Sequence, residues 1–182
     1  MRYIMPCLLK PPVVEYHREL VDGIADSFGL TFTRQQAIPA HFTLKYHFGT
    51  ADIQTVEDLL EQFARTQSRT PITVGGFGHF DEDVVFVEVS LSHAARRSLE
   101  ALTGALRTVP RMPWSPFDAE RIHPHMTIAE RCRPRFAELW DYLKPFERRF
   151  TAWLDNVTIL RKTGERDGRD FWTVHRSFEL GP

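Results

Sequence analysis

Cysteine is scarce in this 182-residue sequence, which contains only two, Cys7 and Cys132. They lie far apart along the chain and form no Cys-x-x-Cys motif, so neither a disulfide framework nor a thiolate metal site is indicated. Neither is placed as a plausible nucleophile. The sequence predicts two free thiols in a reducing, cytoplasmic environment.

Long hydrophobic runs and an excess of one charge are also missing. The apolar start of the chain is interrupted by Pro6 and ended by Lys10, which makes it too short for a secretory signal. No run approaches the roughly 20 apolar residues of a membrane helix, so no membrane partner is expected. The formal net charge of −1 excludes a broadly basic surface for duplex nucleic acid. A partner with few phosphates remains compatible, because a small site needs only local positive charge.

The remaining composition is that of a globular protein, with 42% hydrophobic and 26% charged residues. The length suits one domain covering residues 1–182, expected as a monomer. Hydrophobic periodicity and Gly/Pro punctuation predict its elements. Strands are expected at about 2–9, 41–48, 72–80, 84–89, 125–129, 150–162 and 171–180, and helices at about 11–28, 52–63, 92–106 and 134–143.

The predicted elements repeat along the chain. Each half contains a strand that carries a histidine, then a helix, then a hairpin. This order indicates an α+β fold with antiparallel sheets, built by duplication from halves of about residues 1–90 and 91–182.

Two tetrads with one pattern stand out, His-Phe-Thr-Leu at 41–44 and His-Met-Thr-Ile at 125–128. On a strand, residues two apart project from the same face, so each histidine lies beside its threonine. The apolar residues between them face the opposite way, toward the core. Each tetrad therefore predicts a half-buried strand whose polar face meets water or an anion.

Such a pair of histidines is suited to phosphodiester chemistry. One imidazole, from His41 or His125, can take a proton from an attacking hydroxyl or water while the other protonates the departing oxygen. The hydroxyls of Thr43 and Thr127 can donate hydrogen bonds to the non-bridging phosphate oxygens. The pattern does not show which histidine is the acid, and the chemistry needs no metal or other cofactor.

In their surrounding sequences, at 39–46 and 123–129, the tetrads resemble the signature of the 2H phosphoesterase superfamily. The chain is most similar to its bacterial 2′-5′ RNA ligase-like proteins, which its last strand also resembles. The resemblance implies a bilobal fold with helices outside and two sheets lining a central cleft, and both tetrads facing that cleft. It further implies activity on RNA ends, cyclic nucleotide phosphates or 2′-5′ linkages, with RNA or a small nucleotide as partner.

Strand parity and composition suggest supporting residues. Lys45 and Arg131 have the parity of the tetrad histidines and are expected to approach the same phosphate, although solvated surface charge is the alternative for each. Phe80, Trp114 and Phe117 are candidates for stacking on a base, with ordinary core packing as the alternative.

The sequence also admits three other interpretations. His123-Pro124-His125 invites a metal site, but no HExxH or acidic ligand pattern accompanies it. The Gly-Gly-Phe-Gly run at 75–78 lacks the spacing of a phosphate loop, so a β-bulge or close strand packing is expected there. A catalytically silent nucleotide-binding or sensing module could use the same cleft, and this stays open beside the enzyme hypothesis.

Overall fold

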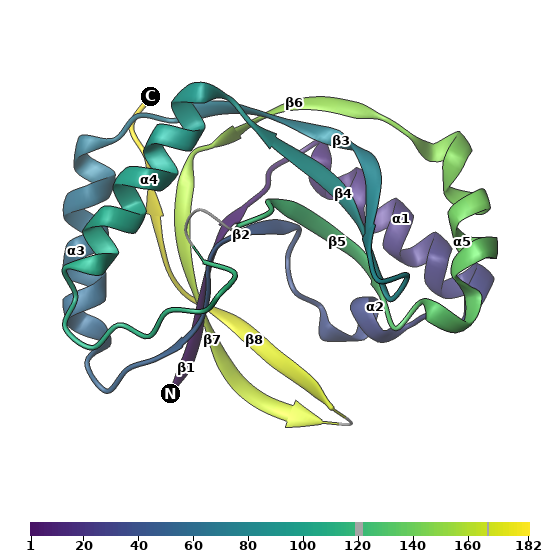
Figure 1. Ribbon diagram of the computed structural model, residues 1–182, viewed down its shortest axis with the longest axis horizontal. Coiled ribbons are helices and arrows are strands. Elements are labelled where there is room, and N and C mark those ends of the chain that lie inside the picture. Colours follow the sequence, from purple (N-terminus) through teal and green to yellow (C-terminus); the bar gives the residue numbers. More distant parts are fainter. Residues whose placement is uncertain (119–121, 167) are drawn as a thin grey trace.

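The computed structural model describes residues 1–118, 122–166 and 168–182. These form two four-stranded antiparallel sheets, sheet I (β2-β1-β7-β8) and sheet II (β5-β4-β3-β6), so the expected α+β class is confirmed. Helices α3 and α4 lie at one end of the molecule and α1 and α5 at the other (Figure 1). The strands are β1 (Arg2–Leu8), β2 (His41–Gly49), β3 (Thr70–Phe80), β4 (Val84–Leu91), β5 (His125–Glu130), β6 (Arg149–Leu154), β7 (Asn156–Arg166) and β8 (Arg169–Glu179). The helices are α1 (Val13–Phe28), α2 (Phe32–Gln36), α3 (Ile53–Thr66), α4 (His93–Arg107) and α5 (Phe136–Leu143), with 3₁₀ turns at Arg133–Arg135 and Lys144–Phe146.

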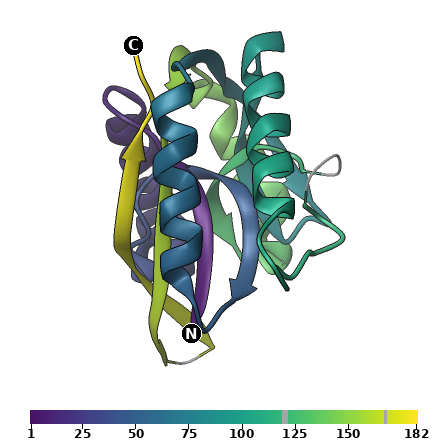
Figure 2. The same ribbon diagram turned by 90° about the vertical axis from the view of Figure 1, so that its left-hand side faces the viewer.

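The long helices begin and end where the sequence predicts. Gly29 ends α1 in the left-handed conformation, at φ 69°. Asp52 caps α3 by accepting a hydrogen bond from the Thr55 backbone N–H at 3.2 Å, and Ser92 caps α4 by accepting one from the Ala95 N–H at 3.1 Å. The two capped helices lie side by side in Figure 2.

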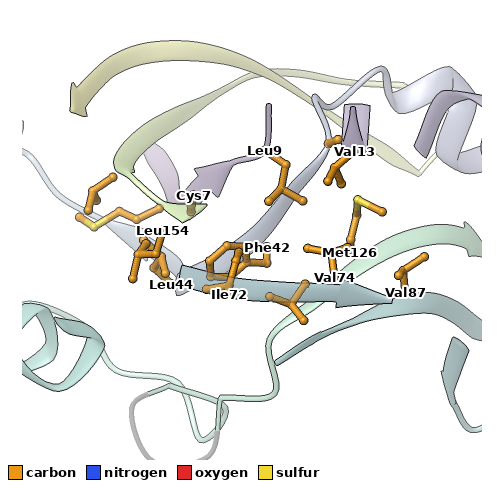
Figure 3. Packing of buried hydrophobic residues seen from close by; sticks show 14 of the residues in the cluster. Cys7, Leu9, Val13, Phe42, Leu44, Ile72, Val74, Val87, Met126 and Leu154 are labelled. Carbon is orange, nitrogen blue, oxygen red and sulfur yellow. The ribbon is translucent and has the colours of Figure 1, made fainter. Parts of the chain in front are cut away.

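One hydrophobic core fills the space between the two sheets (Figure 3). Phe42 of sheet I packs in the same fully buried cluster as Val74, Val87 and Met126 of sheet II. Phe42 and Met126 are the residues between histidine and threonine in the two tetrads. Their burial confirms that each tetrad turns its apolar positions inward, which leaves the polar positions on the other face.

A β-bulge lies at Gly75 and Gly76, as expected, where the register of β3 against β4 shifts between Val74 and Phe77. Gly76 has a φ of 85°, and a Cβ on Gly75 would lie 2.5 Å from the Arg148 carbonyl oxygen of the neighbouring chain segment. Both positions therefore require glycine for backbone reasons. The run is a structural feature of the sheet and not a phosphate loop.

The single strand predicted at 150–162 was wrong, because two strands occupy it in different sheets. β6 pairs with β3 in sheet II, and β7 pairs with β1 and β8 in sheet I. The chain changes sheets at Asp155 and Asn156. The buried Asn156 amide accepts from the Leu8 N–H at 3.0 Å and donates to the Leu8 carbonyl at 2.8 Å, which fixes the start of β7 beside β1. The sign of this crossing in the sequence is the pair Asp155-Asn156, two residues that are depleted in strands and typical of turns.

The proposed boundary near residue 90 does not separate the two sheets. Each sheet takes two strands from the first half and two from the second. In each sheet the strand with a tetrad pairs with a strand that precedes it across a long helix, β1 with β2 across α1 and β4 with β5 across α4. The division into two halves stays a prediction. The order of elements along the chain does not show which strands join which sheet. The short helix α2 was also missed, because five residues are too few to show a helical period.

Among the described residues, none of the helices is both long enough and apolar enough to cross a membrane.

Candidate active site

The two tetrads lie on β2 and β5, each the edge strand of its sheet, and these two strands contact each other (Figure 1). Both strands have the same irregularity. Pro6 of β1 faces Thr43 and Met5 faces Lys45, so Leu44 is an extra residue on β2. On β5 the extra residue is Ile128, in the register shift that follows Thr127. Each His-x-Thr is therefore followed by a β-bulge, which changes the parity of the next residues. On β2 a second register shift, between Tyr3 and Met5 of β1, lets His47 line the cleft as well as Tyr46.

The structure brings the four predicted residues together in one cleft of about 390 Å³, a volume suited to a small ligand. A second cavity of about 360 Å³ lies beside α4 and holds none of the four. Helix α2 and the β7–β8 hairpin also contribute to the first cleft. Its described lining residues are Ile4, His17, Thr33, Gln36, Ile38, His41, Thr43, Tyr46, His47, His125, Thr127, Glu130, Gly168, Asp170 and Trp172.

The two tetrad histidines are held by equivalent hydrogen bonds. His41 Nδ1 lies 2.8 Å from the Pro39 carbonyl oxygen, and His125 Nδ1 lies 2.6 Å from the His123 carbonyl oxygen. A carbonyl can only accept, so Nδ1 carries the proton in both rings. In the neutral state this leaves each Nε2 with a free lone pair. Both rings are therefore prepared to take up or release a proton at Nε2.

Burial makes both imidazoles hard to protonate. It lowers the pKa of His41 to about 4, a direction that the charges of His17 and His125 reinforce and the Pro39 hydrogen bond opposes. Burial also lowers the pKa of His125, against the hydrogen bond to His123. A bound anion would favour the charged rings and raise both pKa values. The cleft thus combines two neutral histidines with two threonine hydroxyls, an arrangement suited to proton transfer around a phosphate.

A third histidine, His17 of α1, also lines the cleft and was not predicted as a site residue. Its Nε2 donates to the Thr127 carbonyl at 2.9 Å, and burial lowers its pKa. The signal for it was present in the sequence, since His17 shares the apolar stripe of the helix. An imidazole among core residues must have a polar partner, which is here the second tetrad strand.

Residues 15–166 match the family model of the 2′-5′ RNA ligase superfamily. The chain belongs to this superfamily of 2H phosphoesterases. Solved structures of similar fold include TT0787 of Thermus thermophilus (20% identity, TM-score 0.59, covering 99% of this chain and 98% of that one). E. coli LigT complexed with 3′-AMP is also similar, with 15% identity and a TM-score of 0.57 over 100% of this chain and 98% of that one. Kluyveromyces marxianus Usb1 has 15% identity and a TM-score of 0.52 over 98% of each chain. At such identities the likeness shows the fold alone. No curated protein matches the chain by sequence.

Lys45 does not face the cleft in this member of the 2′-5′ RNA ligase superfamily. The expectation that Lys45 contacts the phosphate was therefore wrong. The bulge at Leu44 turns Lys45 into the protein, where its side chain is 1% exposed and its Nζ lies 2.7 Å from Asp118 Oδ2. Tyr46 takes the cleft-facing position instead. Strand parity counted from His41 failed because it assumed an unbroken pleat.

Arg131 is likewise absent from the described cleft lining, for the same reason. The bulge at Ile128 places Glu130 in the cleft. Arg131 has a φ of 61°, and its guanidinium lies over the Phe32 ring at 4.0 Å and donates to the Gly168 carbonyl at 3.2 Å. It therefore connects α2 to the β7–β8 hairpin beside the cleft.

None of the three aromatic candidates lines the cleft, although Phe80 and Phe117 contact residues that do. Phe80 packs edge-on against the His125 ring, with centroids 5.0 Å apart. Trp114 lies over Lys45 Nζ at 4.9 Å, and Phe117, 64% exposed, has its ring 6.1 Å from that of Tyr46. Base stacking by these rings stays a prediction.

Other aromatic side chains do line the cleft. His47 and Trp172 stack there, with their planes at 6° and their centroids 5.2 Å apart.

Both cysteines are free, as predicted, and both are buried. Burial raises the pKa of each thiol to about 12, which makes both cysteines poor nucleophiles.

Proposed function

We propose that the chain is a metal-independent phosphodiesterase acting on RNA ends, cyclic nucleotide phosphates or 2′-5′ linkages. The observation that supports this most is the pair of histidines, each Nδ1–H bonded to a carbonyl, that share one cleft with two threonines. Family membership supports phosphoester chemistry. The LigT complex contains 3′-AMP, a nucleoside monophosphate of the kind that opening a 2′,3′-cyclic phosphate releases.

In the proposed hydrolysis, a neutral His41 Nε2 takes a proton from water as the water oxygen attacks phosphorus. The bond from phosphorus to the leaving ribose oxygen breaks, and a protonated His125 Nε2 gives its proton to that oxygen. The hydroxyls of Thr43 and Thr127 donate to the non-bridging oxygens, where negative charge accumulates. If the 5′-hydroxyl of a second RNA replaces the water, its oxygen attacks the phosphorus of a 2′,3′-cyclic phosphate and His41 takes its proton. The bond from phosphorus to the ribose 3′ oxygen breaks, His125 protonates that oxygen, and the RNA ends are joined through a 2′-5′ linkage.

The assignment of His41 as base and His125 as acid rests on their surroundings. His41 has the more strongly lowered pKa, because burial and the charges of His17 and His125 all act on it in one direction. The ring that is harder to protonate is the better candidate for the neutral base. His125, with the smaller shift, is the better candidate for the imidazolium.

The pH dependence follows from these shifts. The free enzyme is active where His41 is neutral and His125 is charged, which requires a pH above about 4 and below the lowered pKa of His125. We expect kcat/KM to reach its maximum on the acidic side of pH 6.5, with kcat reaching its maximum at higher pH because the bound anion stabilises the imidazolium. Initial rates with uridine 2′,3′-cyclic phosphate, whose base does not titrate in this range, measure both. A kcat/KM maximum above pH 6.5 would contradict the lowered pKa values of the two histidines, on which the assignment rests.

The proposal is tested by a hydrolysis screen in EDTA with 2′,3′-cyclic nucleotides and 2′-5′ linked dinucleotides, the products being separated by chromatography. Turnover in EDTA supports it. Among the described residues no group of three or more His, Cys, Asp or Glu side chains could hold a metal, but retention of activity in EDTA is still to be measured. Nucleotide binding without product from any of these substrates would favour the alternative of a silent binding or sensing module.

A further inference from the structure

Glu130 is an acidic residue in a cleft proposed to hold a phosphate. It ends β5, and the bulge at Ile128 directs it into the cleft beside the second tetrad. Its side chain is partly buried, and among the described residues it has no hydrogen-bond or ion-pair partner. Arg131, the nearest cation in sequence, is engaged with Phe32 and Gly168. Glu130 therefore has no structural contact that explains its presence.

The charges around Glu130 are unfavourable for a strongly anionic ligand. Burial raises the Glu130 pKa, the charge of Arg131 lowers it, and Asp83 in the β3–β4 turn raises it further. Asp170 of β8 lines the same cleft, with its Oδ1 2.5 Å from Lys162 Nζ. None of the described residues that line the cleft is lysine or arginine. Among these described lining residues, the side chains that can carry a positive charge are the imidazole rings of His17, His41, His47 and His125.

Of the two strands that carry a tetrad, only β5 has a carboxylate at this position. Counting from the two histidines, Tyr46 occupies on β2 the position that Glu130 occupies on β5, each following its bulge. Both line the cleft. A neutral phenol on β2 thus occupies the position that a carboxylate occupies on β5, in an otherwise matched pair of His-x-Thr strands, so the two strands differ in charge at this position.

We infer that Glu130 is a specificity-determining residue that admits singly charged phosphodiesters and disfavours doubly charged phosphomonoesters. The inference rests on the proposed function. A phosphodiester carries one negative charge, whereas a phosphomonoester loses its second proton near pH 6 and carries almost two at pH 7. Hydrolysis of a diester produces a monoester. Glu130 therefore lowers product affinity, so that release of the new dianion follows the chemical step.

The test compares Glu130→Gln, which keeps the shape and removes the charge, with the wild type. Calorimetric titration with 3′-AMP at pH 7 is expected to show about tenfold tighter binding to Glu130→Gln, because a like-charge contact has been removed. The KM for adenosine 2′,3′-cyclic phosphate should fall by a smaller factor. Between pH 5 and pH 7, the difference between the two proteins should widen more for the monoester than for the diester, because only the monoester gains a second charge in this range.

Glu82→Gln supplies the matched control, because Glu82 is exposed in the β3–β4 turn and does not line the cleft. This variant should bind 3′-AMP as the wild type does. Equal 3′-AMP affinity in the wild type and Glu130→Gln overturns the inference, as does equal tightening for monoester and diester. Binding needs no turnover, so a wild type inactive on every diester would contradict the proposed function while the titration still decides the role of Glu130.

Discussion

His125→Ala is expected to lower hydrolysis of a 2′,3′-cyclic nucleotide by about 10²- to 10⁴-fold, the usual contribution of one general acid or base. The imidazole is held by a single hydrogen bond to the His123 carbonyl, so its loss removes the proton donor while leaving the strand in place. The same loss is expected for His41→Ala. Steady-state kinetics and circular dichroism measure the two effects separately.

A substrate with a good leaving group distinguishes the roles of the two histidines. A nucleoside 3′-(p-nitrophenyl) phosphate needs little protonation of its leaving group, so His125→Ala should lose far less activity on it than on a 2′,3′-cyclic nucleotide. His41→Ala should lose similar activity on both, because the attacking water still requires a base. His93→Ala is the control, since His93 is exposed at the start of α4 outside the cleft. Full activity in both tetrad variants would refute the proposed mechanism.

Asp118→Ala is expected to lower the free energy of unfolding by about 3–5 kcal/mol, because it leaves a buried ammonium without its counter-charge. The Lys45 and Asp118 side chains are each 1% exposed. Asp118 also accepts hydrogen bonds from the backbone N–H groups of Tyr46, at 2.8 Å, and Ser115, at 2.6 Å. The residue therefore joins the strand of the first tetrad to the loop that follows α4. Urea denaturation measures the loss.

Two further variants control for this expectation. Lys45→Met combined with Asp118→Asn removes both charges and keeps an acceptor for the backbone, so it should be less destabilised than the sum of the single changes. Asp141→Ala breaks the exposed pair with Lys144 and should cost no more than about 1 kcal/mol. A loss below about 1 kcal/mol for Asp118→Ala would show that the buried pair contributes little to stability.

The sequence was sufficient for the parts of the site that depend on local rules. The alternation of the tetrads placed His41, Thr43, His125 and Thr127 on polar strand faces, and the structure has all four in one cleft. Helix ends could likewise be read from a capping residue or a glycine, because caps depend on neighbours a few residues away.

The rest of the site depends on features without a local signature. The bulges at Leu44 and Ile128 fall in ordinary strand sequence. The first places Tyr46 in the cleft instead of Lys45, and the second places Glu130 there instead of Arg131. The bulges are set by strand pairing, because the register of β2 is fixed against β1 and that of β5 against β4. Contacts over long sequence separations, such as His17 with the Thr127 carbonyl, could not be deduced from periodicity.

The two histidines lie in different sheets, so the packing of the hydrophobic core between the sheets determines the distance between them. Phe42 and Met126 point into that core from between each histidine and its threonine (Figure 3), and both are fully buried. The span between the reacting nitrogens is thus maintained by close packing across the molecule and not by either strand alone. Changing the volume of a core side chain would alter that span without touching the ligand. If the two rings act together as proposed, turnover depends on the fit of residues that never contact the substrate.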